Sequence, residues 1–269
     1  MNQRPKTKDY QLTIGWLYPE LMSTYGDRGN IICLQKRCEW RGIGVQIITL
    51  DLGFKIDDLR RCNILFMGGA QDTQQKIVSH DFSKEKVKAL KDMVADGIPG
   101  LYICGAYQFL GNYYKEADGT VINGLGILDL HTENPGEGHS RLIGNSVARV
   151  LDNKIIVGFE NHGGRTYLGK GVKPLGKVIK GFGNNGEDLS EGAIYKNSFC
   201  SYFHGPILPK NPHFADLLIK LALEKKYSSP TCPPSLRLGA GRRVNPSSLD
   251  DSLETKARDT IAKRLNIDL

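Results

Sequence analysis

The chain has 269 residues, of which 40% are hydrophobic and 24% charged, an ordinary balance for a globular protein with a sizeable core. Its 36 Lys and Arg residues outnumber its 29 Asp and Glu residues, which gives a formal net charge of +7. The basic residues are scattered and form no run with aromatic residues, which argues against a known nucleic-acid-binding module.

The cysteine spacing and the hydropathy pattern limit the cellular setting. No two cysteines have the CxxC spacing of a zinc ribbon or a thioredoxin motif. No apolar run is long enough to span a membrane, and the first residues lack the apolar core and cleavage site of a secretory signal. We therefore expect a cytoplasmic protein with reduced thiols. The six cysteines are Cys33, Cys38, Cys62, Cys104, Cys200 and Cys232.

Strand and helix patterns alternate along the first half of the chain. The loop at 19–29 is unusually long for a plain connection, which makes it a candidate site loop. Ser83 is a suitable N-cap for the second helix, and Gly97 a suitable end. The alternation predicts an α/β fold with a mostly parallel, doubly wound sheet flanked by helices and with ligands at the carboxyl ends of its strands. The expected strands cover 10–18, 45–50, 62–67 and 101–103, and the expected helices cover 30–41 and 83–96.

Shorter strand patterns separated by Gly- and Asn-rich turns follow from about residue 123. They predict a small antiparallel extension of the main sheet. The run at 199–204 is expected to rejoin the main sheet, and an amphipathic helix is expected at 212–227. The strands of the extension are expected at 126–130, 146–151, 155–159, 175–179 and 193–196.

The composition changes after Tyr227 and divides the chain into three predicted parts. Residues 1–227 form the main domain, and 228–248 form a Pro/Gly/Ser-rich linker without a core pattern. Residues 249–269 then form an amphipathic helix. It either packs on its own domain or docks onto a partner, and both alternatives stay open. Its apolar residues are Leu253, Ala257, Ile261 and Leu265.

The stretch Pro99–Gly111 contains the best candidate for a reactive residue. A buried apolar strand ends abruptly at Cys104, and Gly105-Ala106 then opens a short helix. A cysteine at such a turn faces the crevice at the edge of the sheet and the positive end of a helix, which favours the nucleophilic thiolate. The alternative is that Cys104 is an inert core residue at a strand end.

Two further features belong to the same sheet edge. The strand before the Cys104 strand ends in Gly68-Gly69, and glycines let backbone N–H groups approach a ligand closely. Together with the N–H of Gly105, this loop can form an oxyanion hole, although a double glycine is often only a turn. His204 ends the strand pattern at 199–204, where it can reach Cys104 and act as its base.

Four motifs in consistent order identify a family resemblance. They are GGAQD (68–72), YICGAYQFLG (102–111), GFENHGG (158–164) and FHGP (203–206). Together they resemble the class I glutamine amidotransferases, in the branch that includes the cobyric acid synthases. The runs LYPELMSTYGDRGN (17–30) and RLIGN (141–145) are similar to the members of that branch that serve peptidoglycan synthesis.

The resemblance implies that the chain hydrolyses L-glutamine and passes ammonia to a second protein. It implies that Cys104 is the nucleophile, that His204 is the general base and acid, and that the amides of Gly69 and Gly105 hold the oxyanion. Arg141 would bind the glutamine α-carboxylate with its bidentate guanidinium group, and Gln108 would line the pocket.

The resemblance also implies the partner and the acceptor. The partner is a Mur-ligase-like subunit of a heterodimer, which uses ATP and Mg²⁺ to activate the D-glutamate α-carboxylate of lipid II. This chain itself is expected to need no cofactor and no metal. The alternatives are a cobyrinic or cobyric acid amidating enzyme, a non-catalytic regulatory subunit on the same fold, and an unrelated cysteine hydrolase.

One position departs from the family pattern. Many class I amidotransferases have a Glu two residues after the histidine, and this chain has Pro206 there. The motif therefore encodes a Cys-His dyad without its orienting acid. In the family resembled, a carboxylate of the partner is thought to complete the triad. We expect weak glutaminase activity from the isolated chain.

Overall fold

Five parallel strands and one antiparallel edge strand form the central sheet of the computed structural model, which describes residues 10–229, 232, 235–238, 244 and 246–267. The strand order is β13-β14-β4-β3-β1-β2. Because β2 and β3 lie on opposite sides of β1, the crevice at the carboxyl ends of β1 and β3 is a topological switch point, where ligands bind in doubly wound folds. The strands are β1 (Gln11–Leu17), β2 (Gly44–Leu50), β3 (Ile64–Met67), β4 (Gly100–Ile103), β13 (Ala193–Tyr195) and β14 (Ser198–Ser201).

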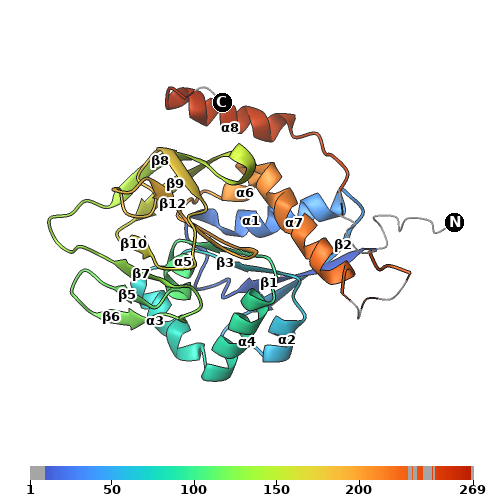
Figure 1. Cartoon of the computed structure of the whole chain (residues 1–269), viewed down its shortest axis with the longest axis horizontal. Helices are drawn as coiled ribbons and strands as arrows, with labels where there is room; N and C mark the ends of the chain where they lie inside the picture. Colours follow the sequence, from blue (N-terminus) through green and yellow to red (C-terminus); the bar gives the residue numbers. More distant parts are fainter. Residues whose placement is uncertain (1–9, 230–231, 233–234, 239–243, 245, 268–269) are drawn as a thin grey trace.

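Helices cover both faces of this sheet (Figure 1). In the view of Figure 1, α1 (Arg28–Glu39), α6 (Ile207–Lys210) and α7 (Pro212–Tyr227) lie above the sheet, and α2 (Ile56–Arg60) and α4 (Lys84–Ala95) lie below it. The strands are apolar on both faces, as a sheet covered on both sides requires; every residue of β3, β4 and β14 is buried. The predicted doubly wound α/β fold is therefore confirmed.

Two four-stranded sheets form the antiparallel extension, which is larger than the sequence predicts. One sheet has the order β10-β7-β5-β6 and the other β12-β11-β8-β9. All pairs in them are antiparallel except β5 with β7. Their strands are β5 (Tyr113–Lys115), β6 (Val121–Asn123), β7 (Leu130–Glu133), β8 (Leu142–Arg149), β9 (Ile155–His162), β10 (Arg165–Leu168), β11 (Gly176–Lys180) and β12 (Ser190–Glu191).

Several element boundaries agree with the predicted ones. Helix α7 has the predicted bounds, and Ser83 caps α4 by accepting a hydrogen bond from Lys86 N at 3.3 Å.

The strand predicted at 126–130 is wrong except for its last residue, which begins β7. The N–H groups of 125–128 instead donate to carbonyls at the end of helix α5 (Gly105–Leu110), so they are not free to pair with a strand. The sequence analysis also missed helix α3 (Asp72–Asp81) and the two short 3₁₀ turns, Thr24–Gly26 and Leu151–Asn153.

The segment after α7 packs more closely than its composition suggests. Although a linker without a core pattern was predicted, Cys232 and Val244 are buried against the core. Helix α8 (Ser252–Arg264) contacts α6 and β9 and buries Ala262, whereas Leu253 and Ala257 of the predicted apolar stripe are exposed. The last two residues of the predicted helix, 268–269, lie outside the described residues.

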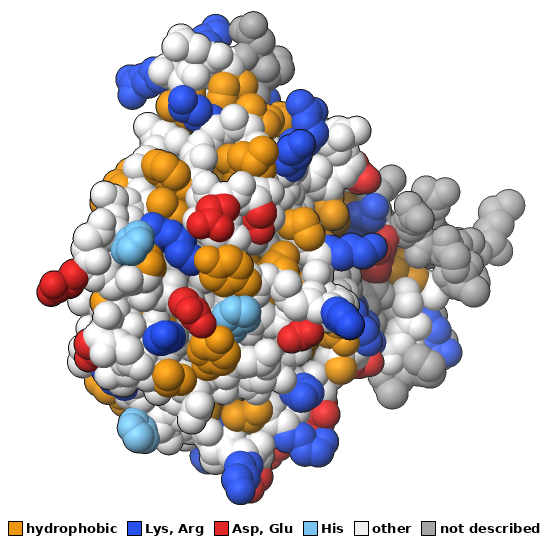
Figure 2. Space-filling model, turned by 60° about the vertical axis from the view of Figure 1, so that its left-hand side comes forward, with side chains coloured by type: hydrophobic (Ala, Val, Ile, Leu, Met, Phe, Trp, Pro, Cys, Tyr) orange, Lys and Arg blue, Asp and Glu red, His pale blue; other side chains and the backbone are white. Residues whose placement is uncertain are grey.

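The surface carries mixed charge on the face that bears the extension sheets. In Figure 2, Lys and Arg side chains on this face are interspersed with acidic and hydrophobic ones and form no continuous stripe. Within the described residues, no helix is both long and apolar enough to cross a membrane.

Candidate active site

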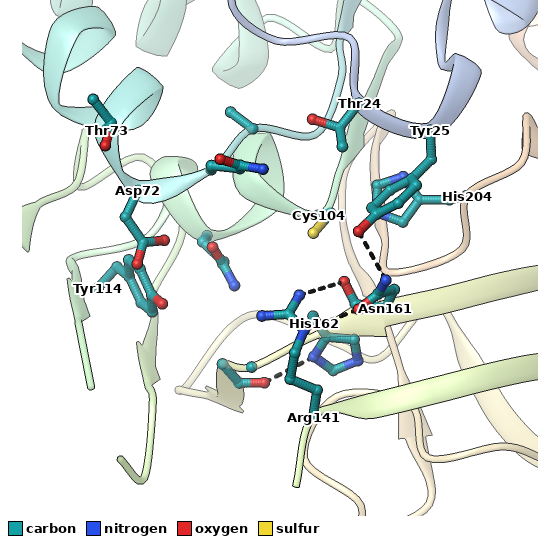
Figure 3. A pocket seen from close by; sticks show the side chains of 15 residues that line it. Thr24, Tyr25, Asp72, Thr73, Cys104, Tyr114, Arg141, Asn161, His162 and His204 are labelled. Atoms are coloured by element: carbon teal, nitrogen blue, oxygen red, sulfur yellow. Dashed lines mark hydrogen bonds between the residues drawn. The ribbon is translucent and has the colours of Figure 1, made fainter. Parts of the chain in front are cut away.

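The segments that follow β1, β3, β4 and β14 meet at one edge of the central sheet and enclose a pocket of about 410 Å³. Cys104, Gln108, Arg141 and His204, all singled out from the sequence, line this pocket (Figure 3). Parallel strands end at the same edge of a sheet, which is why residues a hundred positions apart come together here.

Cys104 lies at a strained turn between β4 and α5. Its backbone angles are φ 49° and ψ −102°, a conformation that a residue with a Cβ adopts only under constraint and that is found at nucleophile elbows. Its N–H donates to Ser201 O at 2.9 Å. Gly105 follows with its Cα so close to the Ala70 backbone that an added Cβ would lie 2.7 Å from Ala70 N. Only glycine fits that position.

His204 is fixed next to Cys104 by its backbone and its ring. Its N–H and C=O both hydrogen-bond to Phe159 of β9, at 2.7 and 3.2 Å. Its Nδ1 lies 3.4 Å from Asp27 Oδ1. Burial alone lowers the pKa of His204, but negative charge on the Cys104 sulfur and on Asp27 outweighs burial and raises the pKa to about 10. The site therefore favours a protonated imidazole beside the Cys104 sulfur.

Asp27 is a residue that the sequence analysis did not single out. It ends the long loop after β1, is fully buried, and accepts a hydrogen bond from Gly69 N at 2.7 Å through Oδ2. The predicted Cys-His dyad thus has an acid in its own chain, supplied by a distant segment and not by the FHGP stretch. The length of the loop at 19–29 indicates a site loop, but it does not single out this residue.

The hydrogen bond to Asp27 affects the predicted oxyanion hole. Because the Gly69 N–H already donates to this carboxylate, it must leave Asp27 before it can donate to a ligand. Gly105 is the first residue of α5, and the first N–H groups of a helix have no partner within the helix. The oxyanion roles of both amides stay predictions.

Arg141 is held at the mouth of the pocket through Asn161. Its Nε donates to Asn161 Oδ1 and its Nη2 donates to Asn161 O, both at 3.0 Å. Asn161 Nδ2 in turn donates to Tyr25 OH at 2.7 Å. The Tyr25 ring packs edge-on against the His204 ring, with 4.9 Å between the centroids (Figure 3). These contacts link the predicted carboxylate-binding arginine to the predicted base.

Gln108 forms part of the buried pocket floor. Its Oε1 accepts from Gln75 Nε2 at 3.1 Å, and its Nε2 donates to Tyr202 OH at 3.2 Å. The Tyr202 ring stacks on His162 with 3.6 Å between the centroids. Both the oxygen and the nitrogen of the Gln108 amide thus have hydrogen-bond partners within the protein, and these hydrogen bonds fix the orientation of the side chain.

The GFENHGG motif (158–164) contains both Glu160 and His162, and of these two only His162 lines the pocket. Its Nδ1 lies 2.8 Å from Gly164 O, and burial lowers its pKa, so the ring is neutral near pH 7. Glu160 instead accepts from Ser146 Oγ and from the N–H groups of Phe182 and Gly183. It holds the turn after β11 and does not face the pocket.

A doubly wound fold with a cysteine elbow facing a histidine at the carboxyl edge of its sheet is the architecture of a class I glutamine amidotransferase. The chain belongs to the CobB/CobQ-like glutamine amidotransferase family, whose domain matches residues 13–212. A solved glutamine amidotransferase has the same fold, with a TM-score of 0.55 at 18% identity over 78% of this chain and 98% of its own. Among the described residues, no group of three or more His, Cys, Asp or Glu side chains could hold a metal ion.

Two curated relatives match most of this chain. The glutamine-hydrolysing GatD subunit of lipid II isoglutaminyl synthase from Staphylococcus aureus (strain N315) is 40% identical over 96% of this chain and 97% of its own length. The GatD subunit from Streptococcus pneumoniae is 44% identical over 81% and 83%. A probable cobyric acid synthase from Methanothermobacter thermautotrophicus is 29% identical, but only 42% of its length is matched.

Proposed function

We propose that the chain is the glutaminase subunit of a two-subunit lipid II isoglutaminyl synthase. The similarity along nearly the whole of the Staphylococcus aureus GatD subunit carries this proposal. The cobyric acid synthase alternative is less well supported, because the matched relative is more than twice as long as the region it shares with this chain. A non-catalytic subunit is disfavoured because Cys104 and His204 are both retained and face one pocket.

The proposed reaction begins with attack by the Cys104 sulfur on the amide carbon of the glutamine side chain. The electron pair of the carbonyl moves to its oxygen, and the resulting oxyanion is held by N–H groups of Gly105 and, once released from Asp27, of Gly69. Protonated His204 gives its proton to the departing nitrogen as the C–N bond breaks, which releases ammonia and leaves a thioester.

Water completes the cycle. His204, now neutral, takes a proton from water while the oxygen attacks the thioester carbon. Collapse of the second tetrahedral intermediate breaks the C–S bond and releases glutamate, and the thiolate and the protonated imidazole are restored. Asp27 stabilises the positive imidazole in both half-reactions because it lies 3.4 Å from Nδ1.

Ammonia then passes to the partner subunit. We propose a Mur-ligase-like protein that forms a heterodimer with this chain and uses ATP and Mg²⁺ to activate the D-glutamate α-carboxylate of lipid II. Ammonia displaces the activating group to give D-isoglutamine. Because the partner's step consumes ATP, the proposal places the complex in the cytoplasm. This chain needs no cofactor for its own step.

The test is amidation of lipid II by the purified complex with two nitrogen sources. Cys104→Ala should abolish amidation from glutamine and leave amidation from ammonium chloride intact, because only the first needs the thiol. Cys33→Ala, which changes a cysteine of α1 outside the pocket, should leave both activities unchanged. Glutamine-dependent amidation by Cys104→Ala would contradict the proposal.

A further inference from the structure

The pocket carries opposite charges on its two sides. Asp72, the first residue of α3, lines one side together with Tyr114, and Arg141, which directly precedes β8, lines the other. In the view of Figure 3, Asp72 lies at the left, Arg141 lies below the centre, and the Cys104 sulfur lies above Arg141. Asp72 and Arg141 are close enough for their charges to interact, yet no ion pair joins them among the described residues.

No cation of the described residues forms an ion pair with Asp72. Lys76, one turn along α3, has its Nζ paired with Glu116 Oε2 at 2.7 Å. Burial and the charge of Glu116 raise the pKa of Asp72, and the Tyr114 hydroxyl and the charges of Lys76 and Arg141 only partly oppose this. A carboxylate in such a setting is stabilised by a cation brought into the pocket.

We propose that Asp72 binds the α-ammonium group of L-glutamine while Arg141 binds its α-carboxylate. This inference rests on the proposed function and extends it to specificity. A free amino acid carries both charges on one carbon, so a zwitterion between Asp72 and Arg141 neutralises both side chains at once. Its side-chain amide then extends toward Cys104. A substrate without the α-ammonium group leaves the half-buried Asp72 carboxylate without a cationic partner, and the pocket discriminates against it.

The other acidic side chains near the pocket already have partners within the protein. Asp27 faces His204 and Gly69, Glu116 is paired with Lys76, and Glu160 is held by Ser146 and two backbone N–H groups. Among the acids that the structure describes, only Asp72 lines the pocket.

The experiment compares L-glutamine with glutaramic acid, which is glutamine without its α-amino group. Glutaminase kinetics are measured on the complex with its ammonia-accepting partner, and binding of both compounds is measured by calorimetry on the full chain with Cys104→Ala. The test variant is Asp72→Asn. The control is Asp57→Asn, which removes an exposed acid from the first turn of α2, away from the pocket.

Wild type should prefer L-glutamine over glutaramic acid by roughly 100-fold in kcat/KM. Asp72→Asn should lower kcat/KM for L-glutamine roughly 10- to 100-fold, mainly through KM, and leave that for glutaramic acid within about threefold. Calorimetry should show that Asp72→Asn also loses the preference for L-glutamine over glutaramic acid in binding. Asp57→Asn should keep this preference. If Asp72→Asn retains the preference while hydrolysing glutamine, the role of Asp72 is wrong and the proposed function stands. If the wild-type complex hydrolyses no glutamine, the proposed function itself fails.

Discussion

The Asp27 carboxylate bridges the predicted base and the predicted oxyanion loop. One oxygen lies 3.4 Å from His204 Nδ1, and the other accepts the Gly69 N–H at 2.7 Å. The chain therefore brings a buried acid to its own histidine, although Pro206 stands where the family resemblance led us to expect a Glu. The partner's carboxylate, expected from the family resemblance, is not needed to place a negative charge beside this imidazole.

Asp27→Asn should lower kcat/KM for glutamine roughly 100-fold. Asparagine keeps the shape and can still accept from Gly69, but it removes the negative charge that stabilises protonated His204. Since that charge raises the pKa of His204, its loss lowers the pKa. The imidazole then loses its proton at lower pH, and the alkaline limb of the rate profile moves to lower pH. The measurement is kcat/KM against pH on the complex.

Two comparisons separate this positioning role from a structural one. Asp57→Asn should leave the rate and its pH profile unchanged. Asp27→Asn should unfold at a similar denaturant concentration to wild type if Gly69 keeps its acceptor. A reduced rate with an unshifted alkaline limb would show that Asp27 does not act through the His204 pKa.

Local sequence patterns predicted the elements that local interactions determine. The periodic apolar residues and Pro212 gave the bounds of α7, and the abrupt change at Cys104 predicted the strained elbow. Asp27 had no such local signal, because its partner His204 is 177 residues away. The strand predicted at 126–130 failed for a related reason, since its backbone N–H groups bond to the end of α5, an interaction that apolar periodicity does not encode.

Helix α3 was missed because its sequence DTQQKIVSHD is mostly polar and buries only Gln75 and Val78. Missing this helix also meant missing a site residue, because α3 begins with Asp72, on which substrate selectivity is proposed to depend. Site residues at predicted strand ends were found, whereas Asp27, near the end of the candidate site loop at 19–29, and Asp72, at the start of the unpredicted helix α3, were not. Apolar periodicity thus indicates a nucleophile and a base at strand ends more readily than the charged side chains around them.

Arg141→Lys should raise KM for glutamine roughly 10-fold and change kcat by less than about threefold. Lysine keeps the positive charge but cannot hold Asn161 with two donors while offering further donors to a carboxylate. Steady-state kinetics of the complex measure both parameters. Arg149→Lys, at the exposed last residue of β8, the strand that Arg141 precedes, is the control and should behave as wild type. A loss of kcat alone would argue against a role in ground-state binding.

Glu191→Gln should make stability less dependent on pH. Glu191 is fully buried, and burial together with the charge of Glu160 raises its pKa to about 8, against hydrogen bonds from Ser201 and Tyr202 N. The unfolded chain ionises this group above about pH 4.5, while the folded chain keeps the proton until about pH 8. The folded state thus binds more protons in between, and the free energy of unfolding falls as pH rises through this window.

Glutamine has no proton to lose, so the stability of Glu191→Gln relative to wild type should increase by roughly 3 kcal/mol between pH 5 and pH 8. Urea unfolding at several pH values measures this difference. Glu187→Gln, at an exposed position before β12, should change nothing with pH. A constant difference between wild type and Glu191→Gln would mean that Glu191 is already ionised in the folded chain.

Arg37→Ala should destabilise the fold and release the C-terminal helix. Arg37 of α1 is 2% exposed at its side chain and donates to Asp216 of α7 at 2.7 Å and to Asp251, just before α8, at 2.7 Å. Removing the cation leaves Asp251 without this partner, while Asp216 keeps its pair with Arg41 at 2.6 Å, and the change costs about 3 kcal/mol in the free energy of unfolding. Because Asp251 loses its ion-pair partner, protease should cleave between α7 and α8 faster than in wild type.

The control is Arg61→Ala, which breaks an exposed pair with Asp58 and should cost less than about 1 kcal/mol in the free energy of unfolding. Equal losses in the two variants, or unchanged cleavage in Arg37→Ala, would show that this buried pairing does not hold α8 in place.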